Sequence, residues 1–217
     1  MSSRSAYRRT CWSVSLLVLV LALFFSSSYA SLPTVEEKLD QYLNAADTVL
    51  QFNGTALVAK GGKVIFAKGY GIADREKKIP NTVDTKFLIG SITKQFTATA
   101  IMQLVADKKL DIDNPISTYL TDYPKSTGDK ITIRHLLTHT SGIQNFTDLP
   151  AYQGMRDKSM TPQQVVAQFK DLSLDFEPGT KFNYSNSGYI LLGLVIEKVS
   201  GEPYAQYLQK HILTRSE

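Results

Sequence analysis

Two hydrophobic periods follow one another along the chain, and together they predict a mixed fold. Between residues 34 and 52, apolar residues recur every three or four positions, which predicts an amphipathic helix. Thr34 is its expected N-cap, with Glu37 in the capping-box position. Two β-rich runs follow, over 54–60 and 63–71, and the glycine pair between them predicts a tight hairpin turn.

The rest of the chain shows helical periods only. The polar connection over 72–86 is expected to be irregular, and it leads to an apolar-periodic helix that starts near Ser91 and continues to Val105. Beyond residue 106, turn signals separate short helices, two of which are expected to end at Gly142 and Gly201. These helices are predicted within residues 131–142, 161–172, 177–201 and 202–213.

The order of these elements predicts an α/β (α+β) fold in two parts. An antiparallel sheet flanked by helices is expected over 31–105, and a mainly helical part over 106–217. Because a two-stranded hairpin is marginal without further strands, we expect the sheet to be incomplete in this chain.

The first thirty residues have the pattern of an export signal. Basic residues precede a fifteen-residue apolar run from Cys11 to Phe25, and small residues at Ser28 and Ala30 flank a cleavage point. An uncleaved membrane anchor is the alternative, but a spanning helix needs about 20 apolar residues. We therefore expect residues 1–30 to be a signal peptide and the remainder to be periplasmic or extracellular, with no stable membrane span after cleavage.

Charge and cysteine content exclude several functional classes. Removing residues 1–30 takes away three arginines and no acidic residue, so the formal charge falls from +4 to +1 over the remaining 187 residues. A nearly neutral chain without a Lys/Arg cluster has no field to hold nucleic acid. The single cysteine, Cys11, lies in the same segment, so the exported part has neither a disulfide nor a thiol nucleophile.

A serine and a lysine stand at the start of the helix near residue 91. Ser91 and Lys94 are three residues apart, so their side chains share a helical face. Gly90 frees the backbone before the turn, and the positive end of the helix dipole favours a developing oxyanion. Ser91 is therefore a candidate nucleophile. The same spacing also arises by chance, because serine is a good N-cap and lysine a common helix former.

A second cluster, with Tyr184 and Asn186, follows a turn signal and precedes an apolar helix. A phenol near Ser91 and a cationic Lys94 can act as base and then as acid to the leaving group. The Asn186 amide can bond a substrate carbonyl or hold Lys94. The same Tyr-x-Asn spacing at 42–44 falls inside the first helix and is interpreted as structural.

With these clusters, the stretch HLLTHTSGI at 135–143 and the hairpin end AKGYGIAD at 67–74, the chain resembles the penicillin-recognising serine hydrolases. The resemblance covers residues 36–213 and is greatest to the branch of class C β-lactamases, D-alanyl-D-alanine carboxypeptidases and related esterases. It implies a β-lactamase/transpeptidase-like fold that needs no cofactor. The implied substrates are D-Ala-D-Ala peptides, including peptidoglycan peptides, β-lactams or small esters.

The resemblance also implies roles for the four residues. Ser91 would be the acylated nucleophile, Lys94 its partner, Tyr184 the candidate general base and Asn186 the contact to the substrate amide. Whether Lys94 or Tyr184 takes the proton stays open, because the two can share it as one coupled unit.

The chain departs from the family pattern after Tyr184. The family closes its site with a K-T-G or H-x-G element on a later strand, which supplies a second oxyanion donor, and no such element follows here. We therefore expect a C-terminally truncated chain of weak stability and low activity unless another polypeptide supplies the missing part. The alternative is a non-catalytic relative that binds peptidoglycan peptides or a partner chain. The oligomeric state is left open.

Two histidines, His135 and His139, are four residues apart, a spacing that can present two metal ligands on one helical face. No glutamate follows His135 as in H-E-x-x-H, and no third ligand is evident. A structural turn is the preferred interpretation, and no metal site is predicted.

Overall fold

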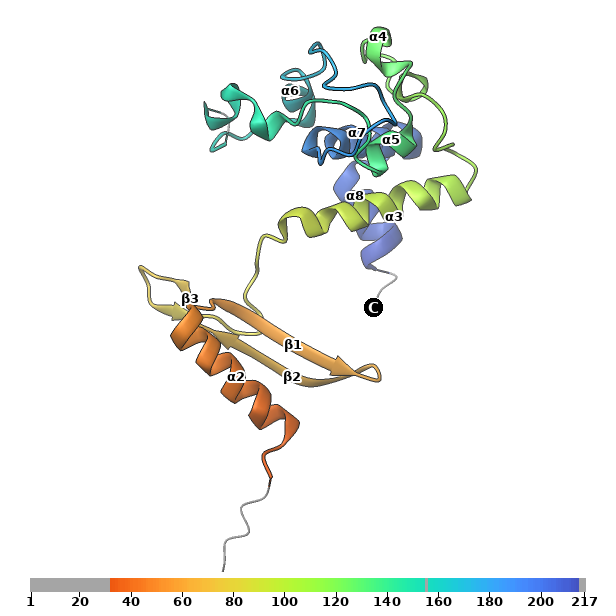
Figure 1. The fold of residues 1–217 in the computed structure, drawn as a ribbon. Coiled ribbons are helices and arrows are strands. Elements are labelled where there is room, and N and C mark those ends of the chain that lie inside the picture. The colour runs from red at the N-terminus through yellow and green to blue at the C-terminus, as the bar shows by residue number, and fades with distance from the viewer. Residues whose placement is uncertain (1–31, 155, 215–217) are drawn as a thin grey trace, which may run out of the picture. The chain divides into compact units, whose positions relative to one another are not determined.

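The computed structural model describes residues 32–154 and 156–214, which form two compact units divided between Phe87 and Leu88 (Figure 1). The predicted export signal lies outside the described residues. The first unit contains the strands, and the second contains helices joined by turns.

The first unit begins with the helix and hairpin predicted from the sequence. Helix α2 (Val35–Leu50) has the expected capping box, in which Thr34 and Glu37 each accept from the other's backbone N–H. Strands β1 (Gly54–Lys60) and β2 (Lys63–Tyr70) pair antiparallel. The turn glycines between them both have positive φ, 58° and 75°, as a tight turn of the mirror-image type requires. Both predictions are confirmed.

The connection after the hairpin is more ordered than its polar sequence predicted. It contains a second, short antiparallel pair, β3 (Ile72–Asp74) and β4 (Ile79–Pro80). The Asn53 side chain holds this pair in place by accepting from the backbone of Ile72 at 2.6 Å and from the Asn81 amide at 2.9 Å. The prediction of an irregular connection was wrong because these bonds join residues far apart in the sequence.

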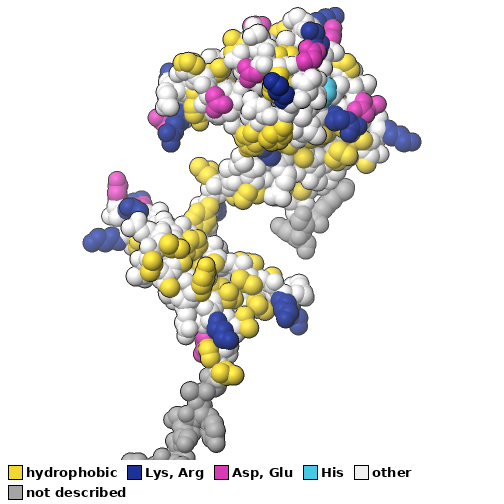
Figure 2. Space-filling view, in the orientation of Figure 1, with side chains coloured by type: hydrophobic (Ala, Val, Ile, Leu, Met, Phe, Trp, Pro, Cys, Tyr) yellow, Lys and Arg dark blue, Asp and Glu magenta, His cyan; other side chains and the backbone are white. Residues whose placement is uncertain are grey.

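The first unit has little core of its own. Among residues 32–87, only Gly54, Tyr70 and Asn81 are buried. Figure 2 shows apolar side chains gathered on the visible face of this unit, and large exposed ones belong to the helix and to both strands of the hairpin: Val49, Leu50, Leu57 and Val64. A hairpin with so little burial is marginal, as the sequence predicted for an incomplete sheet.

The second unit is built on two long helices that pack against each other. Helix α3 (Thr93–Ala106) follows a 3₁₀ turn over Gly90–Ile92, and helix α7 (Asn186–Ser200) ends at Gly201 with φ 73°, as predicted. Helix α3 packs on α7 and on α8 (Tyr204–Leu208) within this unit, whereas the sequence pattern predicted it to belong with the strands over 31–105. Their apolar faces, the segment over 131–136 and Phe169 make the core, which contains Ala100, Ile101, Leu104, Ile131, Ile133, Leu136, Phe169, Leu191, Leu192, Val195 and Ile196.

Short helices complete the second unit, and two of them end earlier than their sequence patterns predicted. They are α4 (Lys125–Gly128), α5 (Ile133–Leu137), α6 (Pro162–Val166) and α8 (Tyr204–Leu208), the last continued by a π-helical turn, η5 (Gln209–Leu213). A 3₁₀ turn precedes them at Ile116–Thr118, and two more lie between α5 and α6, at Phe146–Asp148 and Pro150–Gly154.

The early end of α5 has a clear cause. The sequence pattern continued to Gly142, but His139 has φ 58°, a left-handed conformation that cannot continue a helix. After the helix ends, the backbone carbonyls of this segment bond to a loop that is distant in the sequence. His139, Thr140 and Gly142 accept through their carbonyls from the backbone N–H groups of residues 183, 179 and 175, at 2.9, 2.8 and 2.8 Å. This loop leads directly into α7.

No helix among residues 32–154 and 156–214 combines the length and the apolar character that crossing a bilayer requires.

Gly142 should be intolerant of a side chain, because its φ is 74° and an added Cβ would overlap the Phe176 carbonyl. We expect Gly142→Ala to lower the free energy of unfolding by about 2–4 kcal/mol. Gly154→Ala is the control, because an added Cβ there meets nothing within 4 Å; it should change stability by less than about 0.5 kcal/mol. Urea denaturation of both variants checks this, and equal midpoints would contradict it.

Candidate active site

The four site residues predicted from the sequence lie together in the second unit. Ser91 Oγ is 2.7 Å from Tyr184 Oη, and Lys94 Nζ donates to Ser91 Oγ at 3.3 Å. Lys94 Nζ also donates to Asn186 Oδ1 at 2.8 Å. The hydroxyl, phenol, amine and amide therefore form one connected set of polar contacts.

Local backbone geometry positions the serine and the lysine. Gly90 has φ 53°, and an added Cβ would meet nothing within 4 Å, so glycine is needed there for its conformation rather than for space. Ser91 follows in the 3₁₀ turn that leads into α3, where the first N–H groups have no intrahelical partner. Lys94 lies one turn further on and is half-buried.

Asn186 is the first residue of α7, and Asn145 fixes it there. The N-cap residue Ser185 makes no capping bond with its side chain. Asn145 Oδ1 instead accepts from the Asn186 backbone N–H at 2.9 Å and from its side-chain Nδ2 at 3.2 Å. The Asn145 amide in turn donates to Thr147 Oγ1 at 2.7 Å. Asn145 thus orients the Asn186 amide so that its oxygen faces Lys94.

A second pair of bonds joins the same segment to α7. Ser187 Oγ donates to the Gln144 carbonyl at 2.7 Å and accepts from the Phe146 backbone N–H at 2.9 Å. Ser187 is fully buried, so these bonds form away from competing water. Sequence reasoning assigned no site role to Asn145 or Ser187, because their partners are about forty positions away and no local pattern marks them.

Tyr184 stands beside a histidine that sequence reasoning treated only as part of a turn. The His139 ring lies 4.5 Å from the Tyr184 ring and 5.1 Å from the Tyr189 ring, centroid to centroid, with interplanar angles of 31° and 33°. Its Nδ1 accepts from the backbone N–H of Ser185 at 3.2 Å. The family-like stretch around residue 139 therefore packs directly against the candidate base.

The charge of Lys94 acts on the neighbouring phenol. Lys94 Nζ is 4.9 Å from the centroid of the Tyr184 ring and 5.4 Å from that of Tyr189. The Lys94 amine, and next the hydrogen bond with Ser91, hold the pKa of Tyr184 below its ordinary value. Burial instead raises the pKa of Tyr189. Opposite shifts of two adjacent phenols are typical of a site that assigns proton transfer to one of them.

Ser91 and Lys94 open into a hollow of about 510 Å³, within the usual range for a small-molecule site. Polar groups lie at the end formed by Ser91, Lys94 and Asn186. The rest of the lining is largely apolar, and it includes Phe146, Tyr152, Tyr189, Ile190 and Leu194. A substrate with a carbonyl at the polar end and an apolar body fits this division.

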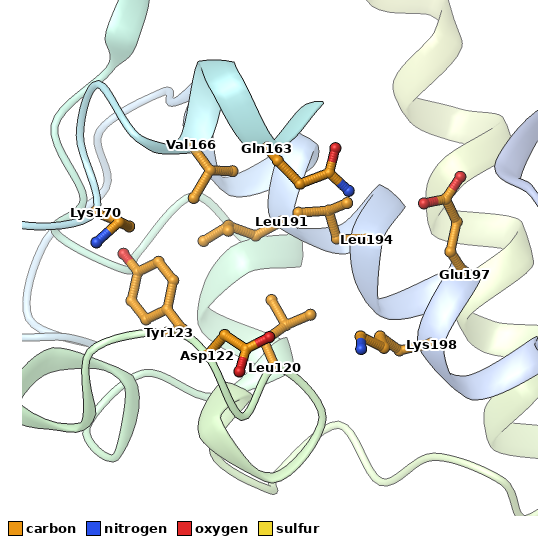
Figure 3. A pocket seen from close by; sticks show the side chains of 10 residues that line it. All are labelled: Leu120, Asp122, Tyr123, Gln163, Val166, Lys170, Leu191, Leu194, Glu197 and Lys198. Atoms are coloured by element: carbon orange, nitrogen blue, oxygen red, sulfur yellow. The ribbon is translucent and has the colours of Figure 1, made fainter. Parts of the chain in front are cut away.

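A second hollow, of about 410 Å³, lies between α6, α7 and the segment around Tyr123 (Figure 3). Leu120, Val166 and Leu191 contribute apolar surface, and the charged side chains of its lining are Asp122, Lys170, Glu197 and Lys198. None of the four predicted site residues lines it, so the candidate chemistry belongs to the first hollow.

The two histidines do not share a helical face. His135 Nδ1 accepts from the Thr132 backbone N–H at 3.2 Å, within the capping box of α5. His139 lies beyond the end of that helix. Over the described ranges, 32–154 and 156–214, no three His, Cys, Asp or Glu side chains gather as a metal site would require.

Comparison with known proteins gives the family and the fold. The sequence matches the family described as Beta-lactamase over residues 39–216. The putative penicillin-binding protein PbpX of Bacillus subtilis is 37% identical over 176 residues, which is 81% of this chain and 41% of that protein. The teichoic acid D-alanine hydrolase of Staphylococcus aureus is 33% identical over 170 residues, 78% of this chain and 40% of that protein.

A solved structure confirms the predicted fold class. The octameric penicillin-binding protein homologue from Pyrococcus abyssi superposes with a TM-score of 0.73 and 37% identity, over 83% of this chain and 43% of that one. The fold is therefore of the β-lactamase/transpeptidase-like α/β class. The chain spans less than half of the length of each of these relatives.

Asn145→Ala should destabilise the second unit, because it leaves the amino end of α7 and the Asn186 amide without their acceptor. We expect the free energy of unfolding to fall by about 1–3 kcal/mol in urea denaturation. Gln153→Ala, which removes an exposed amide in the same unit, is the control and should stay within about 0.5 kcal/mol. An equal loss in both variants would rule out the capping role.

Tyr184 should deprotonate below the ordinary tyrosine value of about 10. In an ultraviolet difference titration, one component should titrate below that value, disappear in Tyr184→Phe and move up in Lys94→Met. Tyr123→Phe should leave the component in place, because burial raises the pKa of Tyr123 to about 12.

The sign of the linked stability follows from this shift. The folded state favours the Tyr184 phenolate, so the contribution is present above the unfolded pKa and is lost as the pH falls through the lowered one. A low-pH component that persists in Tyr184→Phe would contradict the assignment.

Proposed function

Because the chain belongs to the beta-lactamase family, we propose that it is an exported serine hydrolase that works through an acyl-enzyme, with Ser91 as nucleophile. The observation that carries the proposal is the 2.7 Å contact between Ser91 Oγ and Tyr184 Oη, with Lys94 Nζ 3.3 Å from the same hydroxyl. Nucleophile and base within hydrogen-bond reach, with the base oriented by a third group, are the signature of covalent catalysis.

In the proposed acylation step, Ser91 Oγ attacks the carbonyl carbon and its proton passes to the Tyr184–Lys94 pair. The tetrahedral oxyanion collapses, the bond to the leaving group breaks, and the pair returns the proton to the leaving nitrogen or oxygen. Water then attacks the acyl carbon and loses its proton to the same pair, the bond between the acyl carbon and Ser91 Oγ breaks, and the pair returns the proton to Ser91 Oγ. The lowered pKa of Tyr184 supports the phenolate as base, assisted by the Lys94 ammonium.

The oxyanion and the substrate amide are assigned to groups around Ser91. The first N–H groups of the helical segment that begins at Gly90 are free of intrahelical partners and lie at the positive end of the helix dipole. We assign Asn186 to the substrate amide, because its Oδ1 accepts from Lys94 at 2.8 Å and has a second lone pair that can accept from a substrate N–H.

The substrate class that we propose is a D-alanyl ester or amide, with D-Ala-D-Ala peptides, β-lactams and small esters as members of the wider class. A relative named as a teichoic acid D-alanine hydrolase supports an ester of D-alanine, and one named as a penicillin-binding protein supports the peptide. Export is proposed from the pattern of residues 1–30.

A fluorophosphonate or fluorescent penicillin should label the wild-type chain covalently, and intact mass should show one adduct. Ser91→Ala should abolish the adduct. Ser126→Ala, which alters an exposed serine on α4, should keep it. A label that survives in Ser91→Ala would disprove the assignment of the nucleophile. Folded wild-type protein that takes no label would favour the non-catalytic, peptide-binding relative instead.

The rate of labelling should distinguish the role of Tyr184 and Lys94 in proton transfer from that of Ser91 as the nucleophile. We expect Tyr184→Phe and Lys94→Met each to slow acylation by about 10²–10⁴-fold, the range for a positioned acid or base. Tyr189→Phe should slow it less than tenfold in comparison, because the Tyr189 hydroxyl donates to the Leu137 carbonyl at 3.1 Å and not to the nucleophile. Rates equal to wild type in Tyr184→Phe would exclude the phenol from the proton transfer.

A further inference from the structure

His139 holds the backbone on both sides of Tyr184. Its carbonyl accepts from the Asn183 backbone N–H at 2.9 Å, and its ring Nδ1 accepts from the Ser185 backbone N–H at 3.2 Å. One residue therefore binds the backbone N–H groups of the residues immediately before and after the candidate base. Ser185 is buried, so its N–H has little access to water as an alternative partner.

The same residue also holds the Tyr184 ring. The imidazole lies against the phenol at 4.5 Å between centroids, and Tyr189 of α7 lies 5.1 Å from the imidazole. Phe182 adds an edge contact at 5.8 Å. The imidazole therefore limits how the Tyr184 ring can turn on the side that it covers.

The backbone conformation of His139 allows it to make both of these hydrogen bonds. Its φ of 58° is left-handed, a conformation that few residue types other than glycine adopt readily; histidine, asparagine and aspartate are among them. That conformation ends α5 and turns the carbonyl and the ring toward residues 183–185.

We propose that His139 is a positioning residue that sets the orientation of the Tyr184 phenol relative to Ser91, and that it does so only as a neutral imidazole with its proton on Nε2. The proposal concerns the same site and rests on the proposed function for its effect on acylation. Protonation would place a hydrogen on Nδ1, opposite the Ser185 N–H, and the two donors would repel each other.

The groups around His139 oppose its protonation. Lys94 of α3, Tyr189 of α7 and Tyr184 of the preceding loop are the titratable side chains that face the ring. Burial first, and then the Lys94 charge, hold the pKa of His139 below its ordinary value. The ring is therefore neutral at neutral pH and becomes charged only as the pH falls below about 6.5.

The test follows the Tyr184 ring directly, in full-length protein that carries ¹³Cζ-labelled tyrosine, with Tyr184→Phe to assign the resonance. The wild-type Tyr184 resonance should step through a midpoint below about 6.5 as the pH falls. His139→Asn should abolish that step, because asparagine accepts the left-handed backbone and its Oδ1 can accept from Ser185, but it does not titrate. His135→Asn is the matched control and should retain the step.

Acylation rates give the second readout. In the wild type, the rate should fall with the same midpoint as the Tyr184 step. In His139→Asn it should stay within roughly tenfold of wild type at neutral pH and no longer fall with that midpoint, with KM unchanged. His139→Ala lacks the acceptor and should slow acylation by more than tenfold, again without a change in KM.

The two readouts separate the two proposals. A Tyr184 step that is absent in the wild type, persists in His139→Asn or disappears in His135→Asn would overturn the positioning role. A step with the expected dependence on His139, in protein that no acylating probe labels, would support the positioning of Tyr184 and count against the proposed hydrolase activity instead.

Discussion

The packing of α3 against α7 is the contact on which the candidate site depends. The two helices bury their apolar faces against each other, and that burial brings their amino ends together. Ser91 stands before one helix and Asn186 begins the other, so residues more than ninety positions apart share one set of hydrogen bonds. A change in this packing would move the Ser91 hydroxyl relative to the Tyr184 phenol.

A single cation organises the polar end of the hollow. Lys94 donates to Ser91 and to Asn186, and it lies near the faces of two tyrosine rings. Its effect differs between the two phenols because of their surroundings. The pKa of the more exposed Tyr184 is lowered, whereas burial raises that of Tyr189. Environment, and not residue type, therefore gives the two phenols opposite pKa shifts.

The segment from residue 139 to 148 holds Tyr184 and Asn186 in place through hydrogen bonds. His139 binds the backbone around Tyr184, and Asn145 caps α7 and orients Asn186. Ser187 of α7 adds two hydrogen bonds to the backbone of the same segment, at Gln144 and Phe146. Such supporting contacts hold reactive side chains in place without touching a substrate.

The sequence alone determined the elements with strong local signals, such as the capping box at Thr34, the glycine turn of the hairpin and the end of α7 at Gly201. It also indicated Ser91 and Lys94 as a pair, because one helical turn joins them. Only the tertiary structure decided the early end of α5, the short second hairpin and the support from His139 and Asn145. Those features depend on hydrogen bonds between segments far apart in the chain, which leave no periodic signal in either one.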